Sequence, residues 1–256
     1  GTLNVSTLEA SRVHIEDGFG DDVAKVEVEG LIRELNNPVN GQFLLNGQIV
    51  DYSNAIFFGG VEADLANGIK VEAEGPVTGG VLFAVKVKFK DSFRYEGMVT
   101  DGTTQLTIVV PPPASTSLTV LLDSAVTDVD LDPGHDYTGD PVKIRARVVS
   151  GSTLVATRVE SGGNNNRKIF EAPVSSFDIG TDTINLLSGN IVVDTSTMAE
   201  NLPLGDGSGN DSDFEIEDSE VTRATFYSSL QTGDRVKARY DVSGGEWDEV
   251  EIELDE

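Results

Sequence analysis

Gly68-Ile-Lys-Val-Glu-Ala-Glu-Gly75, followed after a short turn by Leu82-Phe-Ala-Val-Lys-Val87, is the stretch that indicates the fold of this chain. Apolar and charged residues alternate through most of the first segment, which is the period of a β-strand with one buried face. The turn Thr78-Gly79-Gly80 leads into the second segment, because glycine adopts the backbone angles of tight turns. The stretch predicts two consecutive strands, the second of which closes a small β unit.

Both segments recur along the chain. The first keeps one glycine-to-valine spacing, at Gly68 and Val71, Gly139 and Val142, and Gly233 and Val236. The second follows Leu-x-Ala-x-x-Val at Leu8, Ala10 and Val13, at Leu82, Ala84 and Val87, at Leu154, Ala156 and Val159, and in altered form at Trp247, Glu249 and Ile252. An ordered set of matches at fixed spacing predicts homologous repeats.

The repeats divide the chain into three units of about five short strands each, without a convincing helix. Their predicted bounds are 18–91 for unit A, 92–161 for unit B and 162–256 for unit C, which holds an acidic loop insertion at 199–220. Short strands separated by turns are typical of small closed or nearly closed barrels. The predicted fold is all-β: three tandem small OB-like β-barrel units plus an extra N-terminal strand.

Residues 1–17 hold a strand that the three units do not need, because each unit already has a closing strand. Its apolar residues are Leu3, Val5, Leu8, Ala10, Val13 and Ile15. A strand without a partner leaves backbone groups unpaired, and it can satisfy them by joining the sheet edge of another copy. Such a contact is heterologous and builds rings or filaments. The alternatives are a remnant of an upstream repeat and a strand that folds back onto unit A.

The chain carries a formal net charge of −26 and no cysteine. A surface this acidic repels phosphate groups, so neither nucleic acid nor an anionic membrane is an expected partner. No apolar run approaches the roughly 20 residues of a membrane-spanning helix, so membrane insertion is not expected. The lack of cysteine excludes disulfides and cysteine zinc sites, and it leaves the compartment open.

No catalytic constellation stands out. The two histidines, His14 and His135, lie far apart in the sequence and near no serine motif, whereas a triad needs a base held against its nucleophile. We therefore do not expect an enzyme. Trp247 is expected to be partly exposed, and four strand aromatic residues are expected in the core: Phe57, Phe58, Tyr95 and Tyr240.

Two acidic loops are candidates for calcium, the one cofactor that the sequence suggests. The first has Asp128, Asp130, Asp132 and Asp136, and the second has Asp206, Ser208, Asn210 and Glu217. Calcium takes oxygen ligands from loops with acidic residues at alternate positions. Both depart from the helix-loop-helix calcium pattern, because Pro133 delays the turn glycine of the first and Asp211 replaces that of the second. The other interpretation is a pair of solvated acidic loops.

The strand ending in Val71-Glu-Ala-Glu-Gly75, followed by Leu82-x-Ala84-x-x-Val87, resembles a bacterial family of unknown function. Members of that family carry tandem short β-barrel domains of OB-like shape, mostly in exported or cell-envelope proteins. Unit B keeps the frame, with Ile144-Arg-Ala146 in the first strand, and unit C departs most. The resemblance implies an exported β protein, and it transfers no catalytic residue.

The sequence favours a non-catalytic structural protein, an extracellular filament or surface-layer-like protomer that self-associates head to tail into a homopolymer by strand donation. The alternative is a calcium- or glycan-binding adhesion module of a larger cell-envelope protein. The pairing partner of residues 2–16, in their own subunit or in the next, is the observation that best separates these hypotheses.

Overall fold

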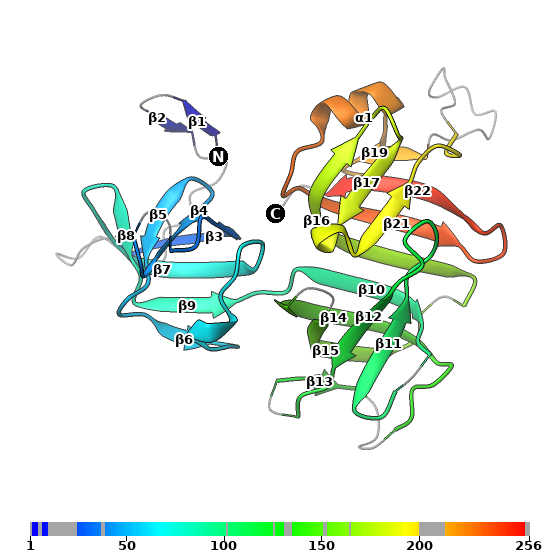
Figure 1. Cartoon of the computed structure of the whole chain (residues 1–256), viewed down its shortest axis with the longest axis horizontal. Helices are drawn as coiled ribbons and strands as arrows, with labels where there is room; N and C mark the ends of the chain where they lie inside the picture. The colour runs from blue at the N-terminus through cyan, green and yellow to red at the C-terminus, as the bar shows by residue number, and fades with distance from the viewer. Residues whose placement is uncertain are drawn as a thin grey trace. The chain divides into compact units, whose positions relative to one another are not determined.

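The computed structural model describes residues 2–4, 7–9, 25–36, 39–100, 102–124, 126–130, 135–150, 153–163, 165–199 and 213–253. Within these ranges the chain is almost all β, which confirms the predicted fold class (Figure 1). The chain divides into two compact units, Gly1–Lys90 and Asp91–Glu256, here called the N-terminal and the C-terminal unit. In the described ranges no helix is long and apolar enough to cross a bilayer.

Two short strands precede the barrel of the N-terminal unit. They are β1 (Thr2–Asn4) and β2 (Thr7–Glu9), which pair antiparallel as a two-stranded sheet of their own. The barrel and its extension use seven further described strands: β3 (Lys25–Arg33), β4 (Gln42–Leu45), β5 (Gln48–Asp51), β6 (Ile56–Phe58), β7 (Lys70–Thr78), β8 (Val81–Phe83) and β9 (Lys86–Phe89). A 3₁₀ turn, η1 (Glu62–Asp64), lies between β6 and β7.

Five of these strands close a ring. They pair in the order β3-β4-β5-β8-β7, and β7 pairs with β3 again. Outside the ring, β9 pairs with β7, and β6 pairs with β9 in parallel. The turn between β4 and β5 has Asn46 and Gly47 at φ of 49° and 82°, the left-handed conformations that a two-residue hairpin requires.

The interior of this barrel follows from the period-two pattern of its strands. Val71 and Ala73 are buried, because successive side chains of a strand point to opposite faces. The predicted closing strand, residues 81–90, is broken into β8 and β9. At the break Gly75 of β7 lies so close to the chain that a Cβ would stand 2.0 Å from the Phe83 carbonyl oxygen. Only glycine permits this approach.

The C-terminal unit has thirteen described strands, one short helix and one 3₁₀ turn. They are β10 (Phe93–Met98), β11 (Gln105–Val109), β12 (Ser117–Leu121), β13 (Asp128–Val129), β14 (Pro141–Ser150), β15 (Thr153–Ser161), β16 (Arg167–Asp178), β17 (Thr183–Leu186), η2 (Leu187–Gly189), β18 (Ile191–Asp194), β19 (Phe214–Ile216), β20 (Ser219–Glu220), α1 (Arg223–Ser229), β21 (Arg235–Asp241) and β22 (Glu246–Glu253). The main path is β11-β12-β15-β14-β10-β16-β21-β22-β19-β20.

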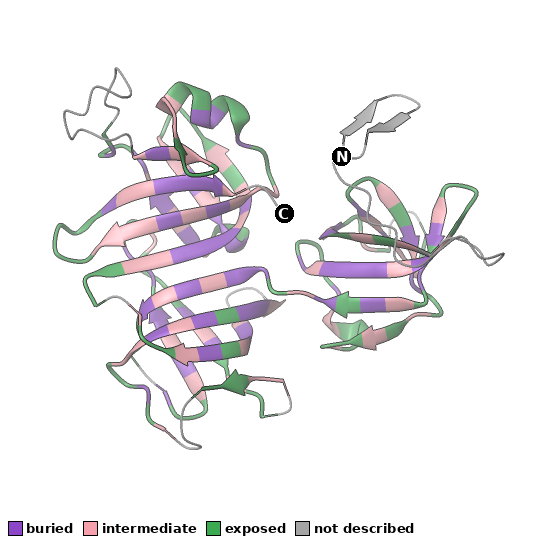
Figure 2. Ribbon diagram, turned by 180° about the vertical axis from the view of Figure 1, so that it is seen from behind, coloured by how far each residue is buried: buried purple, intermediate pink, exposed green. Residues whose placement is uncertain are grey.

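The pairing of β10 with β16 joins the two halves of this path. Tyr95 and Phe170 stand opposite each other in that ladder, with ring centroids 5.1 Å apart. Trp247 lies 5.8 Å from Phe170 on the other side. All three are buried, so one hydrophobic core runs through the C-terminal unit. Figure 2 shows the resulting alternation of buried and more exposed residues along its strands.

One order of pairings occurs three times among the described strands. β3 pairs antiparallel with β7, β10 with β14, and β16 with β21. The strand pairs β6–β9, β13–β15 and β19–β22 are parallel in each case. The ladders close a complete ring in the N-terminal unit, whereas units B and C share one compact unit. The count of three OB-like barrels stays a prediction.

The prediction that the chain has no convincing helix was wrong at residues 223–229. Helix α1 is capped by the Thr222 side chain, which accepts a hydrogen bond from the Thr225 backbone N–H, as N-cap threonines do. Its residues Phe226 and Tyr227 are buried. The C-terminal part of the predicted loop insertion at 199–220 is not loop, because β19 and β20 lie there.

Trp247 is buried, with 3% of its surface exposed, so the prediction of partial exposure was wrong. The predicted alignment of the last closing strand was wrong as well. Along the ladders Val250 faces Ala238 as Val87 faces Ala73, and a register shift follows between Arg239 and Tyr240. The β14–β15 pair has the same register shift, between Arg145 and Ala146. The predicted alignment was therefore two residues out of step, and Glu249 stands opposite Arg239 instead of taking an alanine place.

Candidate functional site

The predicted subunit-joining strand is described at two of its six residues. Leu3 lies on β1 and Leu8 on β2, and they stand opposite each other in that small sheet. The other four, Val5, Ala10, Val13 and Ile15, lie outside the described residues. In the described part of the chain β1 and β2 pair with no barrel strand.

The first predicted calcium loop is described at Asp128, Asp130 and Asp136, while Asp132 lies outside the described residues. Asp128 and Asp130 are exposed. The Asp136 carboxylate accepts hydrogen bonds from the Thr138 hydroxyl at 2.6 Å and from its backbone N–H at 3.0 Å. These bonds hold the pKa of Asp136 below its ordinary value. This carboxylate is therefore already engaged in a local Asx turn.

The second predicted calcium loop is described at Glu217 alone, which is exposed and has a φ of 51°. Its other residues, Asp206, Ser208 and Asn210, lie outside the described residues.

Calcium binding by these loops stays a prediction that calorimetry can test. Titration with Ca²⁺ is expected to give saturable heat with a Kd of about 10⁻⁴–10⁻³ M, the range of weak extracellular sites. The double variant Asp130→Asn, Asp136→Asn is expected to lose the heat of calcium binding that comes from the first loop. Titration with Mg²⁺ serves as the control. Unchanged heats in millimolar calcium would exclude the calcium hypothesis.

An exposed apolar edge strand ends the sheet of the N-terminal unit. Strand β6 pairs with β9, and the described residues place no strand on its other side. Phe57 packs inward, with its ring centroid 6.3 Å from that of Tyr52 and 6.4 Å from that of Phe89. Ile56 and Phe58 expose 64% and 47% of their surface. Ile56, Phe57 and Phe58 are called the β6 edge below.

Of the four aromatic residues predicted in the core, Tyr95 is fully buried, while Phe57 and Tyr240 are half-buried. The prediction was wrong for Phe58. Because side chains alternate along a strand, Phe58 must face away from the core if Phe57 faces into it. The Lys86 ammonium lies 5.7 Å from the centroid of the Phe58 ring, which gives that ring a partial cover through a cation–π contact.

The parallel edge strands of the C-terminal unit are protected, in contrast to the β6 edge. β19 has β22 on one side and β20 on the other, with Glu215 opposite Glu220. β13 is two residues long, and Asp128 and Asp130 place charges at both of its ends. Short length, charge and cover by another strand are the ordinary ways of preventing edge pairing. The β6 edge has none of these except its short length.

Charged side chains form ion pairs across the outer faces of the central strands. In the N-terminal unit Lys90 Nζ lies 2.7 Å from Glu72 and 2.9 Å from Glu29. In the C-terminal unit the pairs are Arg94 and Arg235 with Glu171, Lys237 with Glu251, and Arg239 with Glu249. A carboxylate as buried as Glu171, whose side chain is 2% exposed, persists only when it is paired. Each of these carboxylates therefore has at least one cationic partner.

Three carboxylates of the C-terminal unit come together at the β19–β22 pair. One oxygen each of Glu215, Glu249 and Glu251 lies within 4.8 Å of the others. Burial raises the pKa of Glu249 and Glu215. Burial is the largest single influence on Glu251 and raises its pKa, but the hydrogen bonds from Lys237 and from the Asp218 backbone N–H, together with the charges of Lys237 and Arg239, outweigh it and lower the pKa. Lys237 and Arg239 already supply cationic partners, so the cluster is best described as the end of the ion-pair face.

We expect Glu215→Gln to stabilise the protein at neutral pH. When folding raises the pKa of a carboxyl group, the ionised carboxylate destabilises the folded state. This destabilisation is absent below the ordinary pKa, where the group is protonated in both states, and complete above the raised pKa. The variant should raise Tm at pH 7 by roughly 1–2 °C and leave Tm unchanged near pH 4. Calorimetric scans from pH 4 to 7 measure both, with the exposed Glu34→Gln as control. A gain of equal size at both pH values would contradict the assignment.

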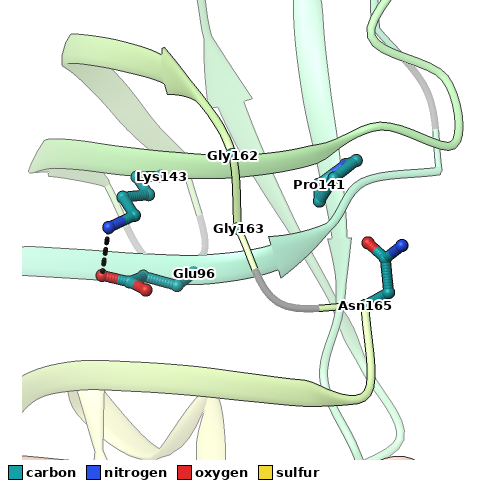
Figure 3. A pocket seen from close by; sticks show the side chains of 6 residues that line it. All are labelled: Glu96, Pro141, Lys143, Gly162, Gly163 and Asn165. Atoms are coloured by element: carbon teal, nitrogen blue, oxygen red, sulfur yellow. Dashed lines mark ion pairs between the residues drawn. The ribbon is translucent and has the colours of Figure 1, made fainter.

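A depression lies where β10, β14 and the segment after β15 meet (Figure 3). Its lining residues are Glu96, Pro141, Lys143, Gly162, Gly163 and Asn165. Lys143 Nζ points to Glu96, 3.7 Å from its Oε1. Gly163 fits tightly, because a Cβ there would stand 2.7 Å from the Val142 carbonyl oxygen. Among the described lining residues there is one ion pair, Lys143 with Glu96, and no nucleophile beside a base.

The sequence predictions missed both the β6 edge and the carboxylate cluster. The cluster had a usable signal, because Arg235, Lys237 and Arg239 alternate on one strand and Glu249, Glu251 and Glu253 on the next. Opposite charges at period two on neighbouring strands indicate cross-strand pairs. The β6 edge had no such signal, because Ala55-Ile-Phe-Phe58 reads equally well as a buried strand.

Residues 29–88 match a family described as a domain of unknown function, DUF5666. The matched range begins in β3 and ends in β9, so it spans the closed ring of the N-terminal unit and its extension with β6. No curated protein matches the chain. The family match concerns the N-terminal unit and does not extend to the C-terminal unit.

Proposed function

We propose that this chain is a non-catalytic, exported structural protein whose copies assemble head to tail. Each copy donates its N-terminal segment, residues 1–17, to a neighbour. The observation that carries the proposal is the closed ring of β3, β4, β5, β8 and β7, which is complete without any residue before Lys25. A segment with strand-forming sequence therefore precedes a barrel that has no place for it in its ring.

The physical chemistry of isolated strands supports donation. The small sheet of β1 and β2 has three residue pairs, and an isolated two-stranded sheet is marginally stable at best in water. Pairing with a larger sheet satisfies the same backbone groups and offers the apolar residues of the segment a sheet face to pack against. Because the donated segment and the accepting surface differ, the contact does not close on itself in a dimer and can propagate.

The extracellular location is part of the proposal. It is supported by the resemblance of residues 68–87 to exported barrel proteins. The net charge of −26 also suits a protein that must remain soluble until it assembles, since like charges oppose nonspecific association.

Deletion of residues 1–17 tests the proposed function. The full chain is expected to form polymers visible by negative-stain electron microscopy and to elute ahead of the monomer in size-exclusion chromatography. The deletion variant is expected to elute as a monomer with unchanged circular dichroism, because its barrel strands are intact. Polymers that persist without residues 1–17 would refute strand donation.

A matched pair of variants tests whether assembly depends on the apolar side chains of the segment or only on the presence of the segment. The triple variant Leu3→Ser, Val5→Ser, Leu8→Ser removes the apolar side chains and is expected to abolish polymers. The control Thr2→Ser, Asn4→Ser, Thr7→Ser changes neighbouring polar positions and is expected to assemble normally.

A further inference from the structure

We propose that the β6 edge is the surface that accepts the N-terminal segment of a second copy. The inference rests on the proposed function and adds to it the acceptor. It concerns a strand of the N-terminal barrel, so it places both the donor and the acceptor in residues 1–90.

Backbone geometry makes the β6 edge competent to pair. The Ile56 N–H donates to the Val85 carbonyl at 3.0 Å, on the side of β9. Because successive residues of a strand direct their backbone groups to alternate sides, the N–H and C=O of Phe57 face the open side. An incoming strand can therefore form the paired hydrogen bonds of a β ladder around Phe57.

The C-terminal unit shows what such an edge receives. Strand β19 has the same parallel relation to β22 that β6 has to β9. Its far side is occupied by β20, a short antiparallel strand supplied by the same chain. After β6 the chain supplies no such strand: residues 59–69, all described, contain only the turn η1. The equivalent strand β13 also has no second neighbour among the described strands, so an occupant of the β6 edge like the one at β19 would have to come from another segment.

Side-chain chemistry points to the N-terminal segment as that occupant. Ile56 and Phe58 expose apolar surface, and Lys86 and Lys88 lie beside them in the ladder. Lys86 already pairs with Glu72 and Glu74, so the exposed Lys88 is the ammonium group that the edge offers to an acidic segment. Residues 1–24 combine alternating apolar residues with an excess of acid: Glu9, Glu16, Asp17, Asp21 and Asp22 against one arginine, Arg12.

The length of the segment allows it to reach another molecule. Twenty-four residues precede β3, and an extended chain spans about 3.3 Å per residue, or roughly 80 Å in all. Apolar contact with Ile56 and Phe58 and attraction between Glu9 and Lys88 set the expected orientation.

Cysteine cross-linking tests the proposal, since the chain has no cysteine of its own. The full-length variants Leu8→Cys and Phe58→Cys are mixed and oxidised, and a disulfide-linked pair of chains is expected. The control mixes Leu8→Cys with Phe83→Cys, an exposed apolar position on β8 of the same barrel. At least tenfold less cross-linked product is expected there. Equal yields, or linkage of Phe58→Cys chiefly to itself, would overturn the assignment.

Charge placed on the edge gives an independent measurement. Ile56→Lys and Phe58→Lys alter exposed side chains, so their thermal melting should stay close to that of the parent. Each is expected to raise the protein concentration needed for polymerisation at least tenfold, and Phe83→Lys to leave it unchanged. If both edge variants polymerise normally while the variant lacking residues 1–17 does not, the β6 edge is not the acceptor, and strand donation itself still holds. If the variant lacking residues 1–17 polymerises normally, both strand donation and the β6 edge as its acceptor are rejected.

Discussion

Gly75→Ala is expected to unfold the N-terminal barrel. A Cβ at this position would stand 2.0 Å from the Phe83 carbonyl oxygen, 2.8 Å from its carbonyl carbon and 3.0 Å from Ala84 Cα. All three are backbone atoms of the break between β8 and β9, so no rotamer change relieves the overlap. We expect a loss of about 3 kcal/mol or more, beyond the usual cost of overpacking, which is a large share of the stability of a small barrel.

Two optical signals make this prediction measurable. The chain has one tryptophan, and Trp247 lies in the core of the C-terminal unit. Far-ultraviolet circular dichroism should therefore lose strand signal, while tryptophan fluorescence keeps its native transition. Gly79→Ala is the control: its φ is 60° but no atom lies within 4 Å of the added Cβ, so about 1 kcal/mol is expected. Equal melting of the two variants would contradict the steric argument.

Phe170→Ala is expected to destabilise the C-terminal unit by about 3–5 kcal/mol, the range for removal of a fully buried aromatic side chain. Phe170 is fully buried, and its ring centroid lies 5.1 Å from that of Tyr95 and 5.8 Å from that of Trp247. Its strand pairs with both β10 and β21, so the cavity would open at the junction of the sheet.

The fluorescence of Trp247 reports this loss directly. Phe170→Ala should shift the emission to longer wavelength and lower the urea midpoint of the fluorescence transition. Phe177→Ala removes the same atoms from the same strand, but Phe177 is only half-buried, with one ring neighbour, Tyr227, at 6.2 Å. It should cost less than half as much. Equal losses for the two variants would show that the junction has no special importance.

Much of the fold could be predicted from the sequence, because its strands follow local rules. The period of two at Val71 and Ala73 identified the buried face of that strand. The alignment of β22 was predicted two residues out of step, since Trp247 stands where the closing strand of unit B has Ala156. The pairing of Val250 with Ala238, which fixes the register, is a long-range contact that the local pattern does not show. Helix α1 was missed because seven residues are too few to establish a helical period.

Long-range pairing was beyond prediction for a different reason. Tyr95 and Phe170 meet in the β10–β16 ladder, yet nothing near either residue specifies the other. The exposure of the β6 edge could not be predicted for the same reason. Exposure of Phe58 depends on what lies beside β6, and a run of apolar residues does not show whether a further strand will cover it.

The pairing of β10 with β16 has a mechanical consequence. A pulling force that enters the C-terminal unit at Phe93 reaches β16 across three cross-strand residue pairs, without travelling along the covalent chain between the two strands. Residues 99–166 are therefore shielded from tension until that ladder ruptures. Because the ladder is antiparallel and Arg94, next to the point of entry, is paired with Glu171, the force loads it from one end, and its three pairs would open one after another before that stretch of chain carries the load.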